Sequence, residues 1–150
     1  MDRKKLWREA ARAGIVWGAV GGIVGFLVSL VGALAGIIAS GFVGASCGRR
    51  AARSLEGVRT PGDGAAAGLA GGLVAMPVFV VGSAAGALVS ASSLGSRRIA
   101  ATLSDATGMD VSPGEAWQIM LLSITFAAFF EAVIFVACAV AAGALLKRKG

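Results

Sequence analysis

One charged side chain, Glu131, lies well inside the long apolar segments of this 150-residue sequence. It stands about 15 residues into the segment 116–146, which places it near the centre of a bilayer if that segment crosses as a helix. An ionised carboxylate at that depth is costly, so such a group takes up a proton or binds a cation. We therefore regard Glu131 as a candidate ion site.

Pro77 suggests a structural alternative for the same carboxyl group. It interrupts the segment 64–95, where we predict a helix kink, and its missing N–H leaves the carbonyl of Leu73 without a hydrogen bond. At about 1.5 Å per residue, Pro77 lies roughly 21 Å from the start of its helix and Glu131 roughly 22 Å from the end of its own. In antiparallel neighbours a protonated Glu131 could donate to that carbonyl. Ion handling and a structural hydrogen bond are both compatible with the sequence.

Other reactive side chains are scarce. The sequence has no His, which excludes His-based catalytic triads and the usual zinc sites. Cys47 and Cys138 lie in apolar surroundings, where packing fits better than a disulfide framework or metal binding. There is no G-x-x-x-x-G-K-[ST] motif. We therefore predict no enzyme, no catalytic residue, no metal and no cofactor.

The composition is that of a membrane protein. Hydrophobic residues make up 57% of the chain and charged residues only 15%, whereas soluble domains are about a quarter charged. The three apolar segments 13–48, 64–95 and 116–146 each exceed the roughly 20 residues that a helix needs to cross a bilayer. The net charge of +6 lies at their edges, which favours the lipid bilayer over nucleic acid as a partner.

The segment 13–48 decides the number of crossings. As one helix its 36 residues would extend about 54 Å, against about 30 Å of hydrocarbon. As a hairpin it would put 12 Lys and Arg residues on one side of the membrane and only Arg97 and Arg98 on the other. If each segment crosses once, seven Lys and Arg residues lie on each side of the membrane. If the second segment is the hairpin instead, eight lie on one side and six on the other. The positive-inside rule favours the first hairpin, although small residues evenly spaced from Gly14 to Ser40 would also suit one continuous helix.

The preferred fold class is all-α, an integral membrane bundle of four transmembrane helices that forms a single domain over residues 1–150. The helices are predicted at about 13–30, 32–48, 64–94 and 116–146, with both termini cytoplasmic in a cell (inner) membrane. "TPGD" at 60–63 and "SPGE" at 112–115 each supply an N-cap, a proline at the first helical position and an acid at the third, so they predict the last two helix starts. Residues 95–111 are predicted to be a polar extracytoplasmic connection with one or two helical turns.

Small residues recur every three or four positions on the first two predicted helices. Helices in lipid associate by close packing, for which such rows are suited. The rows predict tight packing within the bundle or, alternatively, a face for self-association. The residues concerned are Gly14, Gly18, Gly22, Gly32, Gly36, Ser40, Gly44 and Gly48.

Two resemblances can be stated. "LLSITFAAFFEAVIFVACAVAAGALL" resembles the carboxylate-bearing helix of rotary ATPase proteolipids, which implies two hairpins, an ion-carrying Glu131 and Gly rows along the inner wall of a ring. The match departs at Val136 and Ala137, which stand where that family has an aromatic-Gly pair. The topology of that family also corresponds to the less favoured arrangement, in which eight Lys and Arg residues lie on one side of the membrane and six on the other. The whole chain, with "GDGAAAGLAGGLVAMPVFVVG" after a basic loop and a Gly-rich hairpin before it, resembles small glycine-rich four-helix membrane proteins of unknown function from archaea and some bacteria. That second resemblance implies no activity.

From these features we expect a small polytopic membrane protein without enzymatic machinery. It would act as a packing or assembly component, either as a homo-oligomer or bound to another membrane protein. The alternative is a proteolipid-like subunit that translocates a proton or cation with Glu131. The two functions differ in whether the Glu131 carboxyl changes its protonation state.

Overall fold

The protein folds into helices throughout the part of the chain that the structure describes. The computed structural model describes residues 3–54 and 60–146, with side chains from Trp7 onward in those ranges. The helices are α1 (Arg3–Ser29), α2 (Ala33–Ser54), α3 (Pro61–Leu94), α4 (Ser96–Thr107) and α5 (Pro113–Ala144). The all-α prediction is therefore confirmed for the described residues.

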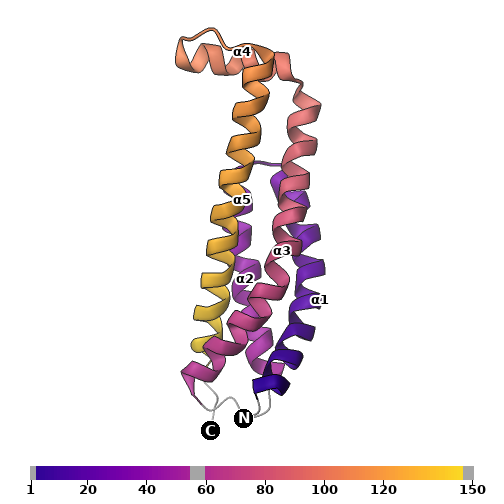
Figure 1. Ribbon diagram of the computed structural model, residues 1–150, viewed down its shortest axis with the longest axis vertical. Coiled ribbons are helices and arrows are strands. Elements are labelled where there is room, and N and C mark those ends of the chain that lie inside the picture. The colour runs from indigo at the N-terminus through magenta and orange to yellow at the C-terminus, as the bar shows by residue number, and fades with distance from the viewer. Residues whose placement is uncertain (1–2, 55–59, 147–150) are drawn as a thin grey trace.

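Four of these helices run antiparallel along the long axis of the molecule, and α4 lies across one end (Figure 1). α3 contacts every other helix, α2 contacts α1, α3 and α5, and the described parts of α1 and α5 do not touch. The start of α1 and the end of α5 lie together at the end opposite α4 (Figure 1). α3 and α5 continue past the turn between α1 and α2, so the end of the molecule next to α4 consists mainly of these two helices.

The segment 13–48 is broken into two helices. The break falls at residues 30–32, where the N–H of Val31 donates to the carbonyl of Val28 over 3.0 Å. Gly32 has a φ of 148°, a value that side chains with a Cβ rarely adopt. Gly32 is therefore a turn residue, and no atom of another helix would lie within 4 Å of a Cβ added to it. The prediction that Gly32 packs against a helix is wrong, because the spacing pattern continues through a turn that takes it off the helix face.

The starts of α3 and α5 are held by capping boxes, as predicted. The Thr60 hydroxyl accepts from the N–H of Asp63 over 3.2 Å, and the Thr60 N–H donates back to the Asp63 carboxylate. Ser112 and Glu115 repeat the arrangement before α5. These reciprocal bonds satisfy N–H groups that a helix start leaves without partners. α1, α3 and α5 begin before the predicted apolar limits, and α2 ends after its own, because polar turns at these ends are also helical. α5 ends at Ala144, two residues before its predicted limit.

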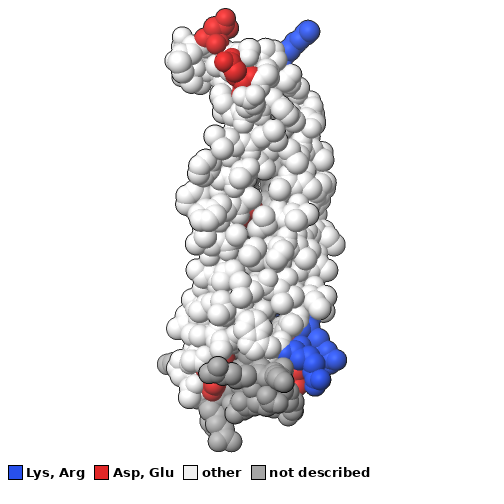
Figure 2. Space-filling view, in the orientation of Figure 1, with Lys and Arg blue, Asp and Glu red and all other residues white. Residues whose placement is uncertain are grey.

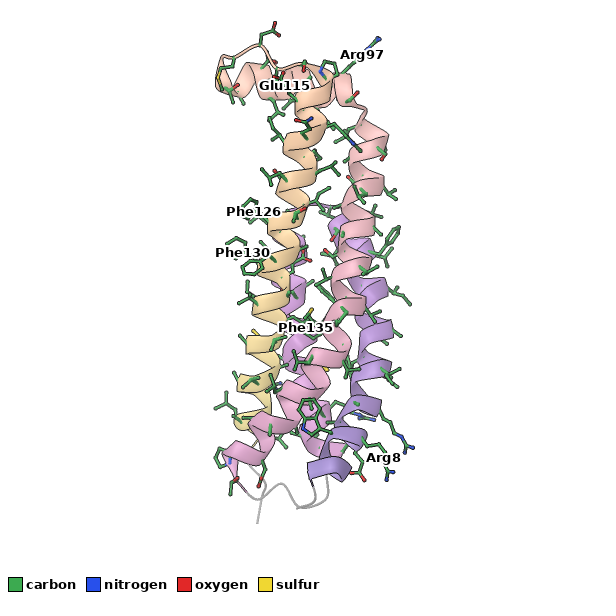
Figure 3. The ribbon with its side chains drawn as sticks, viewed as in Figure 1. Arg8, Arg97, Glu115, Phe126, Phe130 and Phe135 are labelled. Atoms are coloured by element: carbon green, nitrogen blue, oxygen red, sulfur yellow. The ribbon has the colours of Figure 1, made fainter. Side chains whose placement is uncertain are left out.

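The connection 95–111 is more helical than predicted. α4 has 12 residues and buries Ile99 and Ala100 against Ala91 of α3 and Ala116 of α5. Its polar face carries Arg97, which points away from the bundle (Figure 3). An amphipathic face that packs on the ends of two helices explains why this polar stretch is ordered as a helix.

Three helices are long and apolar enough to cross a membrane among the described residues: Trp7–Ser29 of α1, Pro61–Leu94 and Pro113–Ala144. α2 is not one of them, because Arg49 and Arg50 follow an apolar run of only about 24 Å. Figure 2 shows charged side chains at both ends of the molecule and an uncharged body between them, apart from a small acidic area in a crevice at mid-height. Arg59 and residues 147–149, which contribute to the predicted charge asymmetry, lie outside the described residues.

Candidate functional site

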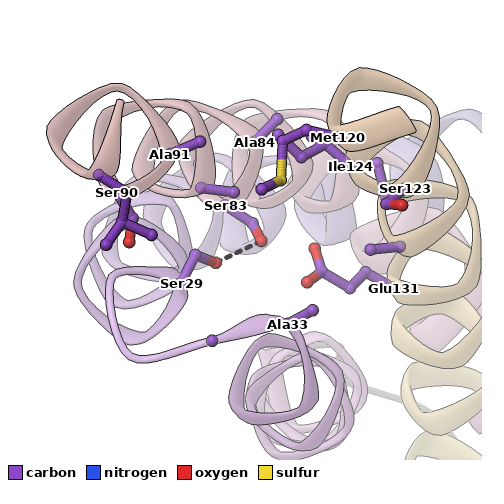
Figure 4. Close-up of a pocket in the computed structure, with 15 residues that line it drawn as sticks. Ser29, Ala33, Ser83, Ala84, Ser90, Ala91, Met120, Ser123, Ile124 and Glu131 are labelled. Atoms are coloured by element: carbon purple, nitrogen blue, oxygen red, sulfur yellow. Dashed lines mark hydrogen bonds between the residues drawn. The ribbon is translucent and has the colours of Figure 1, made fainter. Parts of the chain in front are cut away.

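Glu131 lies inside the bundle, where four helices meet. Its side chain is only 2% exposed. It extends from α5 toward Ser83 of α3 and Ser29 at the end of α1 (Figure 4). On the α2 side it faces Gly36, and a Cβ added at Gly36 would overlap the Oε1 atom of Glu131. The small-residue row of α2 therefore makes the space that the carboxyl group occupies.

A cavity of about 180 Å³ begins at this carboxyl group and extends toward α4 between α3 and α5. Its base is formed by the α1–α2 turn. Its far end reaches the exposed side chains of Leu94 and Ser123. The cavity is lined by Ser29, Gly32, Ala33, Ser83, Ala84, Ala87, Ser90, Ala91, Leu94, Met120, Ser123, Ile124, Ala127, Ala128 and Glu131.

The carboxyl group is incompletely satisfied. Its Oε2 atom is buried and has no hydrogen-bond partner. The two hydroxyls nearest the base, those of Ser29 and Ser83, are hydrogen-bonded to each other over 2.6 Å. A buried polar atom without a partner costs free energy, and a buried carboxylate without one costs more. The site therefore favours a bound proton, or a bound ligand that donates to Oε2.

The cavity is closed on the side facing the chain termini. Phe79 of α3 and Phe135 of α5 are fully buried there, with ring centroids 5.3 Å apart. Val43, Cys47 and Ala75 complete this core cluster. Water does not enter well-packed apolar cores of this kind. Glu131 therefore lies between a cavity that includes four serines on the α4 side and a dry core on the other.

The structure does not bring Glu131 to the carbonyl of Leu73. Neither Leu73 nor Pro77 lines the cavity that holds the carboxyl group, although Pro77 does lie inside α3. Side chains on a helix lean toward its N-terminus, and the N-terminus of α5 points toward α4 in this antiparallel pair. The carboxyl group is thus carried toward Ser83, which lies about 15 Å further along α3 than Leu73. The proposed hydrogen bond to Leu73 is therefore wrong.

The other small residues of the two predicted rows face neighbouring helices. On α1, Cβ atoms added at Gly14, Gly18 and Gly22 would lie 2.6 to 3.2 Å from atoms of α3. On α2, Cβ atoms at Gly44 and Gly48 would overlap the carbonyl oxygens of Phe135 and Ala139. Ser40 is fully buried and donates to the carbonyl of Ile37 within its own helix. These contacts are all made within one chain.

The serines of the cavity are functional candidates that sequence reasoning missed. Ser83 and Ser90 are seven residues apart on α3, and Ser123 precedes Glu131 by eight on α5. Spacings of seven and eight put side chains on one face of a helix. The available signals were that Ser123 shares a face of α5 with Glu131 and that Ser83 and Ser90 share a face of α3. Ser29 could not be found this way, because the α1–α2 turn brings it to the site.

Metal and sulfur chemistry have little support at this site. Among the described residues, no cluster of three or more His, Cys, Asp or Glu side chains could hold a metal ion. Cys47 and Cys138 are free thiols. No protein-family model, curated protein or solved structure matches the chain. The resemblances to glycine-rich four-helix proteins and to proteolipids therefore stay predictions.

Proposed function

We propose that α1, α2, α3 and α5 all cross a cell membrane, with both termini in the cytoplasm. α2 is the least apolar of the four, and its contacts with α1, α3 and α5 support its insertion as half of a hairpin. Arg8 lies at the end of the molecule that holds the termini and Arg97 at the other (Figure 3). The close contacts at Gly44 and Gly48 support glycine packing as the means by which these helices are held together.

We propose that the protein is a non-enzymatic membrane component that takes up and releases a proton, or a cation in its place, at Glu131. The observation that carries this proposal is the buried Oε2 atom without a partner at the base of a cavity whose lining includes four serines. A carboxyl group that served only for packing would be expected to have its hydrogen bonds satisfied within the bundle. Because Phe79 and Phe135 close the opposite side, exchange takes place from the α4 side.

Infrared difference spectroscopy of the purified protein in lipid vesicles tests this function. We expect a band of a protonated carboxyl group that responds to bulk pH and shifts when the vesicles are moved into heavy water. The band should be absent from Glu131→Gln and present in Asp105→Asn, a matched control at an exposed position of α4. A Glu131 band that responds to neither pH nor heavy water would mean a sealed structural carboxyl group and would overturn the proposal.

A second candidate function is that of an assembly component. The apolar window of α5 is only 11% buried within the chain. Its outer face carries Phe126, Phe129 and Phe130, each more than half exposed, and Phe126 and Phe130 point away from the bundle in Figure 3. A neighbouring helix of another membrane protein or of a second copy would cover this face. The native mass of the detergent-extracted protein tests this second function. A mass that corresponds to one chain alone would argue against assembly.

A further inference from the structure

We infer that the ligand of the Glu131 cavity is a small organic ammonium ion, with its charged group at Oε2 and its apolar part along the cavity walls. This inference rests on the proposed function, because it requires Glu131 to exchange its proton with the α4 side. The ammonium group would donate a hydrogen bond to the oxygen that has no partner. The proton of Glu131 would leave to bulk water as the ion binds, so the buried site gains no net charge.

The walls of the cavity favour an organic ion. Above the carboxyl group they consist mainly of apolar side chains, among them Ala87, Ala91, Met120 and Ile124. No Lys, Arg or second acidic side chain of the described residues lines the cavity. One carboxylate in an apolar cavity matches one positive charge on an apolar body, since each part of the ligand then meets a complementary surface.

A bare metal ion fits the same cavity poorly. Hard cations such as Ca²⁺ take six or more oxygen ligands, and Mg²⁺ takes six in a near-ideal octahedron. At the base of the cavity the hydroxyls of Ser29 and Ser83 already bond each other. Ser90 and Ser123 are about two helical turns away from that level. The oxygens are therefore too dispersed to replace the hydration shell of a metal ion.

The size of the cavity limits the ligand. A cavity of about 180 Å³ has room for on the order of ten water molecules. It is smaller than the roughly 300 to 1,000 Å³ of sites that hold drug-sized ligands. A short-chain primary ammonium ion fits within this limit, whereas a lipid does not.

Calorimetric titration of the purified protein in detergent with butylammonium tests the inference, with butanol as its neutral counterpart. We expect one butylammonium per chain, release of about one proton, and binding of butanol at least about tenfold weaker, since a hydrogen bond to a charged group is lost. Glu131→Gln should weaken butylammonium binding by a similar factor. Equal binding of butanol, or displacement of butylammonium by equimolar Na⁺, would overturn the inference.

Ala87→Leu separates this inference from the proposed function. The larger side chain fills the cavity without touching the carboxyl chemistry, so it should weaken butylammonium binding at least about tenfold and leave the pH-dependent Glu131 infrared band in place. Ala137→Leu, at an exposed position of α5 outside the cavity, should change neither. Normal proton exchange with no butylammonium binding would refute the ammonium ligand alone. If the unmodified protein shows no pH-dependent Glu131 band, so that the carboxyl group does not exchange its proton, the proposed function is refuted.

Discussion

Replacing Gly44 by Ala tests whether the contact between α2 and α5 holds the bundle together. The added Cβ would overlap the carbonyl oxygen of Phe135 and lie 3.0 Å from its carbonyl carbon and Cα. These are backbone atoms of a helix interior, so no side chain can rotate away to make room. The two helices must separate by roughly 1 Å to restore ordinary contact distances.

Gly41 provides a matched control three residues earlier on the same helix. A Cβ added there would lie 3.7 Å from Cys138 and Ile134 side-chain atoms, which is ordinary van der Waals contact. Overpacking at Gly44 should cost about 1 to 3 kcal/mol, whereas Gly41→Ala should gain up to about 1 kcal/mol from helix propensity. Gly44→Ala gains the same helix propensity, so the free energies of unfolding of the two variants should differ by the overpacking cost alone, about 1 to 3 kcal/mol.

The assay is titration with sodium dodecyl sulfate in mixed micelles, with helical circular dichroism as the signal. Wild type, Gly41→Ala and Gly44→Ala are compared in the same micelles, so that detergent effects cancel. If the two variants unfold at the same detergent fraction, α2 and α5 do not pack at Gly44 and the account of glycine packing fails.

Two further predictions concern topology and the α1–α2 turn. A cysteine replacing Ser54 should be protected from a membrane-impermeant thiol reagent in intact cells, whereas one replacing Thr107 should be labelled. Both positions are exposed on the surface of the protein. The reverse labelling pattern would contradict cytoplasmic termini. Gly32→Ala should destabilise the protein by about 1 to 3 kcal/mol in the same unfolding assay, because φ at this residue is 148°. Gly114→Ala is the control: no atom lies within 4 Å of the added Cβ, so this change should leave stability nearly unchanged.

Local signals predicted the helix boundaries best. The two capping boxes depend on side chains within three residues of each other, so Thr60 and Ser112 mark helix starts without reference to the rest of the chain. The break in the first apolar segment was predicted from charge balance and helix length. Its position at Gly32 was obscured because small residues continue at helical spacing on both sides of the turn.

The surroundings of Glu131 were harder to predict because they depend on three helices besides its own. Residue counts placed the carboxyl group level with Pro77, but they describe helix axes and not the direction in which a long side chain leans. The turn that delivers Ser29 and the space left by Gly36 come from the other hairpin. A single sequence contains no direct signal for such contacts between hairpins.

The contact pattern of α2 has a consequence for the order in which the protein can be completed during synthesis. α2 lacks the apolar length of α1, α3 and α5, and the backbone surface against which Gly44 and Gly48 pack belongs to α5. The ribosome makes α5 after α1, α2, α3 and α4. The packing of the second helix is therefore completed only after the fifth has been synthesised, and until then Gly44 and Gly48 lack the backbone surface that they contact in the folded chain.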